Sequence, residues 1–155
     1  MRDSAAGAVE RMMPFARQHK IRVEVTGEKG EGVFDSEIFR RVFDNLVSNA
    51  INACEPGALV TVNIRSSGSA IRAEVRDPGR GIDPKFHDTI FDQFALADER
   101  EAVTKSGSFG VGLAFCKLAV GTHGGRIGLD SKVGCGSTFW FEFPAGPPSP
   151  TGSVP

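Results

Sequence analysis

Two glycine-rich turns constrain this chain more than any other feature. The first, Asp77-Pro-Gly-Arg-Gly-Ile82, follows an alternating apolar segment and begins with an acidic residue. The second, Gly107-Ser-Phe-Gly-Val-Gly-Leu113, opens an apolar helical segment. Glycine allows a backbone to approach a partner closely, and N–H groups at a helix start are unpaired donors with positive partial charge. A carboxylate and two such turns are the components that hold an adenine at one end and a triphosphate at the other.

Composition limits the class of protein. The 155 residues are 40% hydrophobic and 24% charged, which is typical of one globular domain that buries its own core. A formal net charge of -1 argues against a surface dedicated to nucleic acid or anionic lipid, because both favour a concentrated excess of Lys and Arg. We therefore expect no nucleic-acid partner.

The cysteines and the apolar segments bear on the compartment. Cys54, Cys116 and Cys135 are an odd number at wide spacings without a CxxC motif, so they indicate neither a disulfide framework nor a zinc site. Reduced thiols in a cytoplasmic protein are the favoured interpretation. No apolar run approaches the roughly eighteen residues of a membrane span, and the N-terminus lacks the apolar core of a signal peptide. We expect a cytoplasmic segment, whether or not its parent protein is anchored in a membrane.

The clearest predicted element is a helix over residues 38–51, capped by Asp35 or Ser36 and ended by Pro56-Gly57. Its apolar residues have the spacing of one buried stripe: Ile38, Phe39, Val42, Phe43, Leu46, Val47, Ala50 and Ile51. A second stripe, expected to be exposed, carries Arg41, Asn45, Ser48, Asn49 and Asn52. Asparagine forms helices poorly, and its amide can coordinate Mg²⁺ or donate to phosphates. Tertiary hydrogen bonds to neighbouring loops are the alternative.

The other elements form segregated groups of helices and strands. Helices are predicted over residues 4–19, with apolar residues Met12, Met13, Phe15 and Ala16 and a kink at Pro14, and from about residue 110 to 120. Strands are predicted over 21–25, 60–64, 71–75, 126–129 and 137–143, the second and third as a hairpin and the last with Phe139, Phe141 and Phe143 on one side. An antiparallel or mixed sheet with helices on one face therefore fits this order best. The polar segment 97–105 is a natural mobile loop, and the Pro-rich tail over 145–155 is expected to be disordered.

Asp77 carries the sharpest local inference. It lies on the same side of its strand as Ile71, Ala73 and Val75, so it points inward. A buried carboxylate is costly unless a donor reaches it, and the exocyclic amino group of adenine is a suitable donor. An Asp before Pro-Gly also commonly caps the following turn, so Asp77 alone leaves both roles open. The glycines that follow let the chain pass close to a flat ring, and the whole motif favours recognition of a base.

The second turn has the spacing GxxGxG, which is neither the dinucleotide fingerprint nor a Walker loop. Taken alone, it fits a flexible loop as well as a phosphate site at a helix start. Other active-site classes are poorly supported, because the chain has no G-x-S-x-G elbow, HExxH pair or cysteine cluster. The histidines share no obvious partner, and His123 is predicted to end a helix and interact with its dipole.

Taken in order, these elements resemble the catalytic and ATP-binding domain of bacterial sensor histidine kinases, within the superfamily of gyrase, Hsp90 and MutL ATPases. The resemblance covers residues 10–144, which we count as one domain over 1–144. Five motifs carry it: Asp44-Asn-Leu-Val-Ser-Asn-Ala50 resembles the N box, Asp77-Pro-Gly-Arg-Gly81 the G1 box, Phe91-Asp-Gln-Phe94 the F box, Gly107 to Leu113 the G2 box, and Gly136-Ser-Thr-Phe139 the final glycine-threonine motif. Any single motif is weak, whereas five in the right order are highly specific. The resemblance implies an α/β (α+β) two-layer sandwich of the Bergerat type, with a mixed, mainly antiparallel sheet of about five strands backed by three main helices. ATP would lie between the helices and a lid over residues 95–106.

The resemblance also implies site roles. Asn49 would coordinate Mg²⁺, with Asn45 beside it on the phosphates. Asp77 would bind the adenine amino group, with Thr138 supporting it from below. The first-turn glycines would border the base, the F-box phenylalanines would anchor the lid, and the backbone of residues 110–113 would wrap the phosphates. The implied ATP-binding residues are Asn45, Asn49, Asn52, Asp77, Gly79, Gly81, Ile82, Phe91, Phe94, Lys105, Gly107, Gly110, Val111, Gly112, Leu113 and Thr138.

The type of reaction follows from one position. ATP-hydrolysing members of the superfamily place a Glu one helical turn before the metal-binding Asn, where it activates water, and this chain has Asn45 there. That agrees with a kinase in which this domain supplies positioning, Mg²⁺ and charge neutralisation for transfer to a histidine on another domain. Many histidine kinases carry Lys and an aromatic residue just after the N box, where this chain has Asn52 and Ala53; Lys105 is a candidate substitute. This departure leaves open a degenerate module that docks partners and regulates without phosphoryl transfer.

The same resemblance suggests which partners the chain has. No histidine lies in a His-Glu or His-Asp setting ahead of the domain, so we expect a fragment of a larger two-component kinase that does not phosphorylate itself. The implied partners are the dimerisation and histidine phosphotransfer domain of the same parent kinase and the receiver domain of a response regulator. Because dimerisation comes from that other domain, the fragment is expected to be monomeric. An ATPase motor or an anti-sigma-type serine kinase is disfavoured by Asn45.

Overall fold

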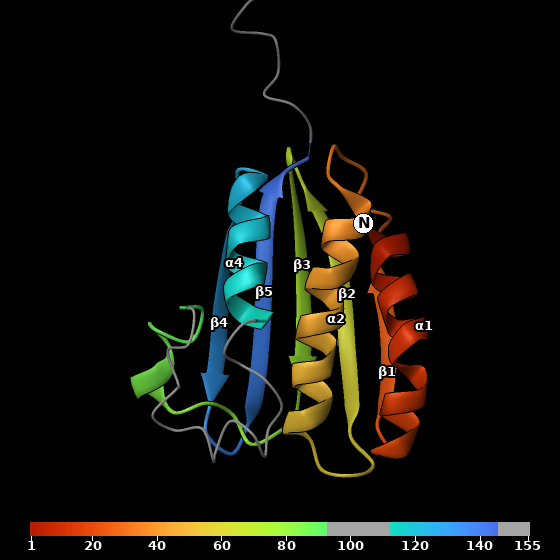
Figure 1. Cartoon of the computed structure of the whole chain (residues 1–155), viewed down its shortest axis with the longest axis vertical. Coiled ribbons are helices and arrows are strands. Elements are labelled where there is room, and N and C mark those ends of the chain that lie inside the picture. Colours follow the sequence, from red (N-terminus) through yellow and green to blue (C-terminus); the bar gives the residue numbers. More distant parts are fainter. Residues whose placement is uncertain (93–111, 146–155) are drawn as a thin grey trace, which may run out of the picture.

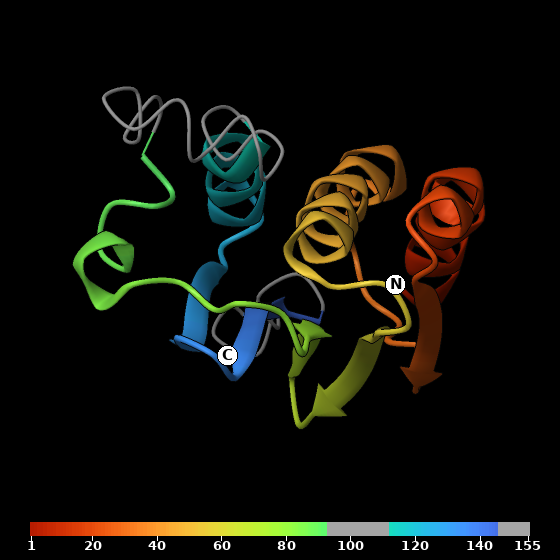
Figure 2. The same ribbon diagram turned by 90° about the horizontal axis from the view of Figure 1, so that it is seen from below.

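The computed structural model describes residues 1–92 and 112–145. In these residues the chain forms two layers, a five-stranded sheet and three α-helices that lie on one face of it (Figures 1 and 2). The elements are α1 (Arg2–Gln18), β1 (Arg22–Gly27), α2 (Ser36–Ala53), β2 (Leu59–Ser67), β3 (Ala70–Asp77), the short 3₁₀ helix η1 (Pro84–Phe86), α4 (Gly112–Thr122), β4 (Arg126–Lys132) and β5 (Gly136–Pro144). The predicted two-layer sandwich is confirmed.

The strands follow the order β1-β2-β3-β5-β4 across the sheet. β1 and β2 are parallel, and the other neighbouring pairs are antiparallel, so the sheet is mixed and mainly antiparallel, as predicted. β2 and β3 form the predicted hairpin. A parallel pair needs a crossover connection, and α2 is the helix that makes it between β1 and β2. The connection thereby places α2 against the inner face of the sheet.

α2 is built as its sequence predicts. The Asp35 side chain accepts hydrogen bonds from the backbone N–H groups of Glu37 and Ile38 at 3.0 and 3.1 Å, which is the geometry of an N-cap. The predicted apolar stripe is buried, apart from Ile38, which is only partly covered: Phe39, Val42, Phe43, Leu46, Val47, Ala50 and Ile51. This amphipathic pattern presses α2 onto the sheet.

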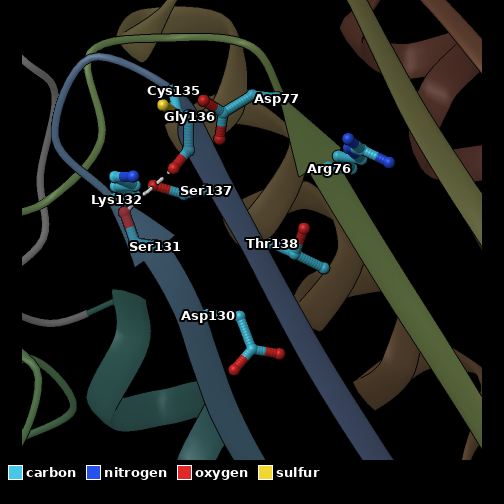
Figure 3. Close-up of a pocket in the computed structure, with 9 residues that line it drawn as sticks. All are labelled: Arg76, Asp77, Asp130, Ser131, Lys132, Cys135, Gly136, Ser137 and Thr138. Carbon is cyan, nitrogen blue, oxygen red and sulfur yellow. Dashed lines mark hydrogen bonds between the residues drawn. The ribbon is translucent and has the colours of Figure 1, made fainter.

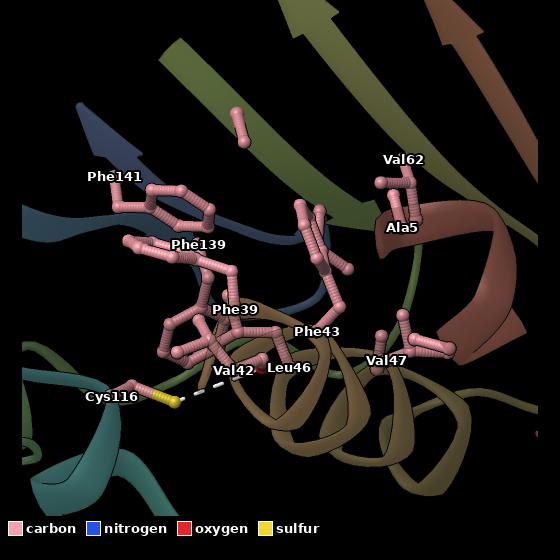
Figure 4. Packing of buried hydrophobic residues seen from close by; sticks show 14 of the residues in the cluster. Ala5, Phe39, Val42, Phe43, Leu46, Val47, Val62, Cys116, Phe139 and Phe141 are labelled. Carbon is pink, nitrogen blue, oxygen red and sulfur yellow. Dashed lines mark hydrogen bonds between the residues drawn. The ribbon is translucent and has the colours of Figure 1, made fainter. Parts of the chain in front are cut away.

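Aromatic rings join α2 to β5. Figure 4 shows Phe139 and Phe141 of the sheet facing the helix that carries Phe39 and Phe43. The ring centroids of Phe39 and Phe141 are 5.4 Å apart, and those of Phe43 and Phe141 are 5.5 Å apart. Such pairs contribute about 0.5–1.5 kcal/mol each beyond the area that they bury. The predicted aromatic side of β5 is thus the centre of the core.

α1 is buried mainly through small residues. Its buried residues are Ser4, Ala5, Ala8, Val9 and Ala16. Its larger apolar residues are only partly covered: Met12, Met13 and Phe15. Small side chains let α1 approach α2 closely, and Arg11 forms an ion pair of 2.6 Å with Asp44 of α2. Pro14 lies inside α1, and the helix continues beyond it to Gln18.

His123 ends α4, as predicted, and also reaches a second helix. Its Nδ1 lies 2.7 Å from the Ala119 carbonyl, and its Nε2 accepts the backbone N–H of Asp35 at 3.1 Å. Because Nε2 is the acceptor, Nδ1 carries the proton and donates to the helix end. The imidazole therefore ties the end of α4 to the start of α2. In residues 1–92 and 112–145, no helix combines the length and apolar character that crossing a membrane requires.

Candidate functional site

The inner face of the sheet changes from apolar to polar at one end. Three rows of paired residues cross β3, β5 and β4 in turn: Ala73, Phe141 and Ile127; Val75, Phe139 and Leu129; Asp77, Ser137 and Ser131. The third row, which we call the polar row, lies where β3 enters the first glycine turn. Polar groups at a core position cost free energy unless they have partners, so this row marks the end of the core and the start of a candidate site.

Asp77 is buried and hydrogen-bonded on one side. Its side chain is 3% exposed, and its Oδ1 accepts the backbone N–H of Gly79 at 2.9 Å. Burial raises the pKa of Asp77 to about 6, an effect that the backbone amides of Gly79 and Ser137 and the charge of Arg80 partly oppose. The two roles that the sequence left open are therefore compatible, because one carboxylate oxygen caps the turn and the other can accept a hydrogen bond from a ligand.

The first glycine turn is seated between two pieces of backbone. A Cβ on Gly79 would strike the Ala53 carbonyl at the end of α2, and the Arg80 N–H donates to that carbonyl at 3.3 Å. Gly81 has a φ of +74° and would strike the Lys132 carbonyl at the end of β4. These glycines are thus required by contacts within the protein. Their expected position beside a flat ring remains a prediction.

One stripe of α2 runs from the start of α4 to the first glycine turn. Asn45, Asn49 and Ala53 follow one another at four-residue spacing and so lie along one side of the helix, which we call the amide stripe. At one end of the stripe, a Cβ on Gly112 of α4 would lie 2.8 Å from the Asn45 Oδ1. At the other end is the Ala53 carbonyl that seats the first turn. Asn49 therefore lies between the start of α4 and the turn that follows Asp77.

Asn49 is buried, although the sequence pattern predicted that it lies on an exposed stripe. It is 4% exposed, because α2 turns this side toward α4 and the first turn, whereas Asn45 and Asn52 are half-buried. Its Nδ2 is buried without a hydrogen-bond partner in the described part of the chain. The nitrogen and oxygen of an amide can exchange places by a half-turn, so this position offers either a donor or a ligand oxygen. Asn49 is therefore suited to hold Mg²⁺ or a phosphate.

The other predicted site residues are distributed unevenly. Phe91 is buried and packs edge-on against Phe139, with ring centroids 6.0 Å apart. Leu113 is fully buried in the core, so only its backbone can face a ligand. The remaining predicted residues Phe94, Lys105, Gly107, Gly110 and Val111, together with the predicted lid over 95–106, lie outside the described residues.

Thr138 lies on the other face of the sheet from the helices. It pairs with Arg76, one position out of step with the inward-facing residues, and Ser137 is the residue paired with Asp77. The prediction that Thr138 supports Asp77 from below is therefore wrong. The alternation of β5 places Ser137, rather than Thr138, beside Asp77. A contact of Thr138 with ATP remains a prediction.

A shallow pocket of about 310 Å³ opens beside Thr138 (Figure 3). Its lining includes Arg76, Asp130 and Thr138, which alternate with the inward-facing residues of their strands. In Figure 3 these three side chains lie on the side of the strands away from the helices. The lining also includes Asp77, Ser131 and Ser137, so the pocket borders the polar row as well as the outer face of the sheet.

Comparison with known families decides what this arrangement belongs to. The family model of the histidine kinase-, DNA gyrase B- and HSP90-like ATPases matches residues 34–147. The chain belongs to this ATPase family. The matched range includes both glycine turns, the amide stripe and the polar row. The resemblance drawn from the five motifs is confirmed.

Relatives of this ATPase-family domain are sensor proteins. Sensor protein IrlS of Burkholderia pseudomallei is 34% identical over 145 residues, which cover 91% of this chain and 31% of that protein. Sensor histidine kinase AruS of Pseudomonas aeruginosa is 37% identical over 155 residues, which cover 92% of this chain and 15% of that protein. The chain thus spans less than a third of these two relatives.

Solved structures share the fold of this ATPase-family domain. The nucleotide-free catalytic domain of histidine kinase ThkA matches with a TM-score of 0.81 at 21% identity, covering 94% of this chain and 93% of that chain. Full-length ShkA in complex with AMPPNP matches with a TM-score of 0.76 at 24% identity, covering 92% of this chain and 29% of that chain. At these identities the likeness establishes the fold of the domain.

Sequence reasoning missed two residues of the site of this ATPase-family domain, Ser131 and Ser137. The alternation that assigns Ile127 and Leu129 to the inner face extends to Ser131, and Phe139 likewise assigns Ser137. That signal was present in the sequence. What it did not reveal is that the two strands lie side by side and next to β3.

Proposed function

We propose that this domain binds Mg-ATP and donates its γ-phosphate to a histidine on a dimerisation and phosphoacceptor domain of the same parent kinase. From there the phosphoryl group would pass to an aspartate of a response regulator receiver domain. The observation that carries the proposal is the amide stripe of α2. It runs from the start of α4 to the first glycine turn, which begins with the buried Asp77. The two ends of this stripe provide separate places for a base and for phosphates.

The base would bind at the Asp77 end. The carboxylate oxygen that does not cap the turn can accept a hydrogen bond from the exocyclic amino group of adenine, a donor that guanine lacks at the same position. The turn residues Gly79, Gly81 and Ile82 would border the ring. Burial of the carboxylate among apolar rows strengthens such a bond, since the surroundings screen it less than water does.

The phosphates would bind at the α4 end. The start of a helix carries unpaired N–H groups and positive partial charge, and Gly112 leaves them uncovered by a side chain of its own. The Asn49 amide would hold Mg²⁺, with Asn45 beside it on the phosphates. A bound Mg²⁺ would neutralise charge on the phosphates. The unpartnered buried amide of Asn49 is the feature that fits this ion.

Transfer to a histidine is favoured over hydrolysis by the chemistry of Asn45. Its Nδ2 donates to the Arg41 carbonyl at 3.0 Å, and an amide cannot accept a proton from an attacking water. The domain would thus bind ATP, orient the γ-phosphate and leave the nucleophile to its partner domain. Since ATP and receiver domains are found in the cytoplasm, we place the domain on the cytoplasmic side of any membrane anchor.

Two measurements test the proposal. Calorimetry with Mg-AMPPNP should detect binding to the chain, and the full-length parent kinase incubated with γ-labelled Mg-ATP should form an acid-labile phosphohistidine. Absence of nucleotide binding would contradict the whole proposal. Binding without phosphohistidine would instead favour a regulatory module, the alternative that Asn52 and Ala53 raise.

A further inference from the structure

Ser131 lies at the centre of a hydrogen-bond cluster for which the proposed function has no role. Its Oγ accepts the backbone N–H of Ile82 at 2.8 Å and donates to the Gly136 carbonyl at 3.1 Å. The hydroxyl of Ser137 lies 2.7 Å away and donates to the same Oγ, because the Ser131 proton is already engaged. A hydroxyl has one donor and two acceptor sites, so all three sites of Ser131 are used.

The cluster joins three segments of the chain. Figure 3 shows Ser131 of β4 turned toward Gly136 and Ser137 at the start of β5. Ser137 is paired with Asp77 across the sheet, and a Cβ on Gly136 would strike the Asp77 carbonyl. One side chain thus contacts both the end of the first glycine turn and the strand segment against which Asp77 lies.

We propose that Ser131 is a positioning residue for the nucleobase: its hydroxyl fixes Ile82 and Ser137, and through them the first glycine turn and the Asp77 carboxylate, in the geometry that receives adenine. The inference rests on the proposed binding of ATP. Ser131 itself touches the turn and β5 through the bonds above, and its effect on a ligand is transmitted by those neighbours.

The effect of Ser131 should be confined to the base end of the site. Its hydrogen-bond partners Ile82, Gly136 and Ser137 all adjoin Asp77 along the polar row or the first turn. The phosphate end is built by α2 and α4, where Asn45 faces Gly112. Loss of the Ser131 hydroxyl should therefore couple to Asp77 and leave the contribution of Asn49 unchanged.

A double-mutant cycle tests this coupling. In Ser131→Ala, the Ile82 N–H and the Ser137 hydroxyl lose a partner, and we expect affinity for Mg-AMPPNP to fall about tenfold, the scale of one unsatisfied buried group. This fall in affinity should be smaller in the Asp77→Asn background. The effects of Ser131→Ala and Asn49→Ala should be independent, so that their fold-changes multiply. Ser131→Thr keeps the hydroxyl and should recover most of the affinity.

The control removes a hydroxyl from the far end of α4. Thr122 donates to the Ala119 carbonyl at 2.8 Å, and Thr122→Ala should leave nucleotide affinity unchanged. Unchanged affinity in Ser131→Ala, or a loss that multiplies equally with Asp77→Asn and Asn49→Ala, would overturn the positioning role. If Ser131→Ala fails to fold, Ser137→Ala removes one bond of the cluster, and a smaller loss coupled to Asp77 is then the supporting result.

A measurement on the free protein separates this inference from the proposed function. Amide hydrogen exchange at Ile82 should be slow in the wild-type chain, faster in Ser131→Ala, and unchanged in Thr122→Ala. If no nucleotide binds to the wild-type chain while Ile82 responds in this way, the proposed function fails but the anchoring of the turn stands. If Ile82 exchanges equally in all three proteins, the anchoring itself is overturned.

Discussion

The Oδ1 of Asn45 lies 2.8 Å from the position that a Cβ on Gly112 would occupy. The Nδ2 of the same amide donates to the Arg41 carbonyl, which orients the oxygen toward α4. A side chain on the first residue of α4 would therefore crowd the Asn45 amide. This contact brings the amide stripe next to the start of α4.

Gly112→Ala should weaken nucleotide binding with little effect on stability. The added methyl group must displace the Asn45 amide from its orientation, so we expect affinity for Mg-AMPPNP to fall about tenfold, as for loss of one hydrogen-bonding group. The free energy of unfolding should change by less than about 1 kcal/mol, because Ala favours the helix. Gly121, also in α4, has open space around it, and Gly121→Ala should leave affinity unchanged. Equal affinities for the two variants, measured by calorimetry, would argue against a role for this contact in binding.

Asp77→Asn should weaken adenine recognition by about 1–3 kcal/mol, the usual scale for an unmatched buried hydrogen-bonding group. The asparagine can still accept the Gly79 N–H through its oxygen, but its other atom becomes a donor that faces the amino group of the base. Asp3→Asn is the matched control, since Asp3 is exposed in the first turn of α1, away from the site. Calorimetry that found unchanged affinity in Asp77→Asn would remove Asp77 from the site.

Asp77 should also make stability depend on pH. Its pKa is raised by burial from 3.8 to about 6, so the folded chain binds a proton more tightly than the unfolded chain. The free energy of unfolding should therefore fall as pH rises from about 4 to about 6 and then level off, with a loss of at most about 3 kcal/mol. In Asp77→Asn this part of the pH dependence should disappear, and stability at pH 7 should increase. Urea denaturation of both proteins across this range is the measurement, and identical slopes would contradict the assignment.

Asn49→Ala should lower Mg²⁺-dependent affinity more than Mg²⁺-independent affinity. Its buried amide has an unpartnered atom that suits an ion or a phosphate, and we expect a loss of about tenfold when Mg²⁺ is present. Asn63 of β2, whose Oδ1 accepts the Thr26 hydroxyl at 3.2 Å, provides the control Asn63→Ala. Titrations of AMPPNP with and without Mg²⁺ distinguish the roles, because equal losses in both conditions would contradict a metal contact.

Several features of the domain could be predicted because they depend on neighbouring residues. The cap at Asp35 and the apolar stripe of α2 follow from spacing along one helix, and the inward direction of Asp77 follows from alternation along one strand. The same alternation assigns Thr138 to the outer face, which family resemblance alone did not reveal. Periodicity depends only on residues that are near one another in the sequence, so it can be recognised without knowledge of the tertiary structure.

The relations between elements were decided only by the tertiary structure. Asn49 is buried because α2 lies against α4 and the first turn, although its sequence pattern suggested an exposed face. Position 79 must be glycine because it lies against the Ala53 carbonyl, which belongs to a helix much earlier in the sequence. Ser131 of β4 likewise contacts Ile82 of the first glycine turn, which is distant in the sequence. Sequence by itself determined which elements form and which residues share one face of an element. Packing determined what each face meets, because contacts between distant segments depend on how the whole sheet and its helices close around one core.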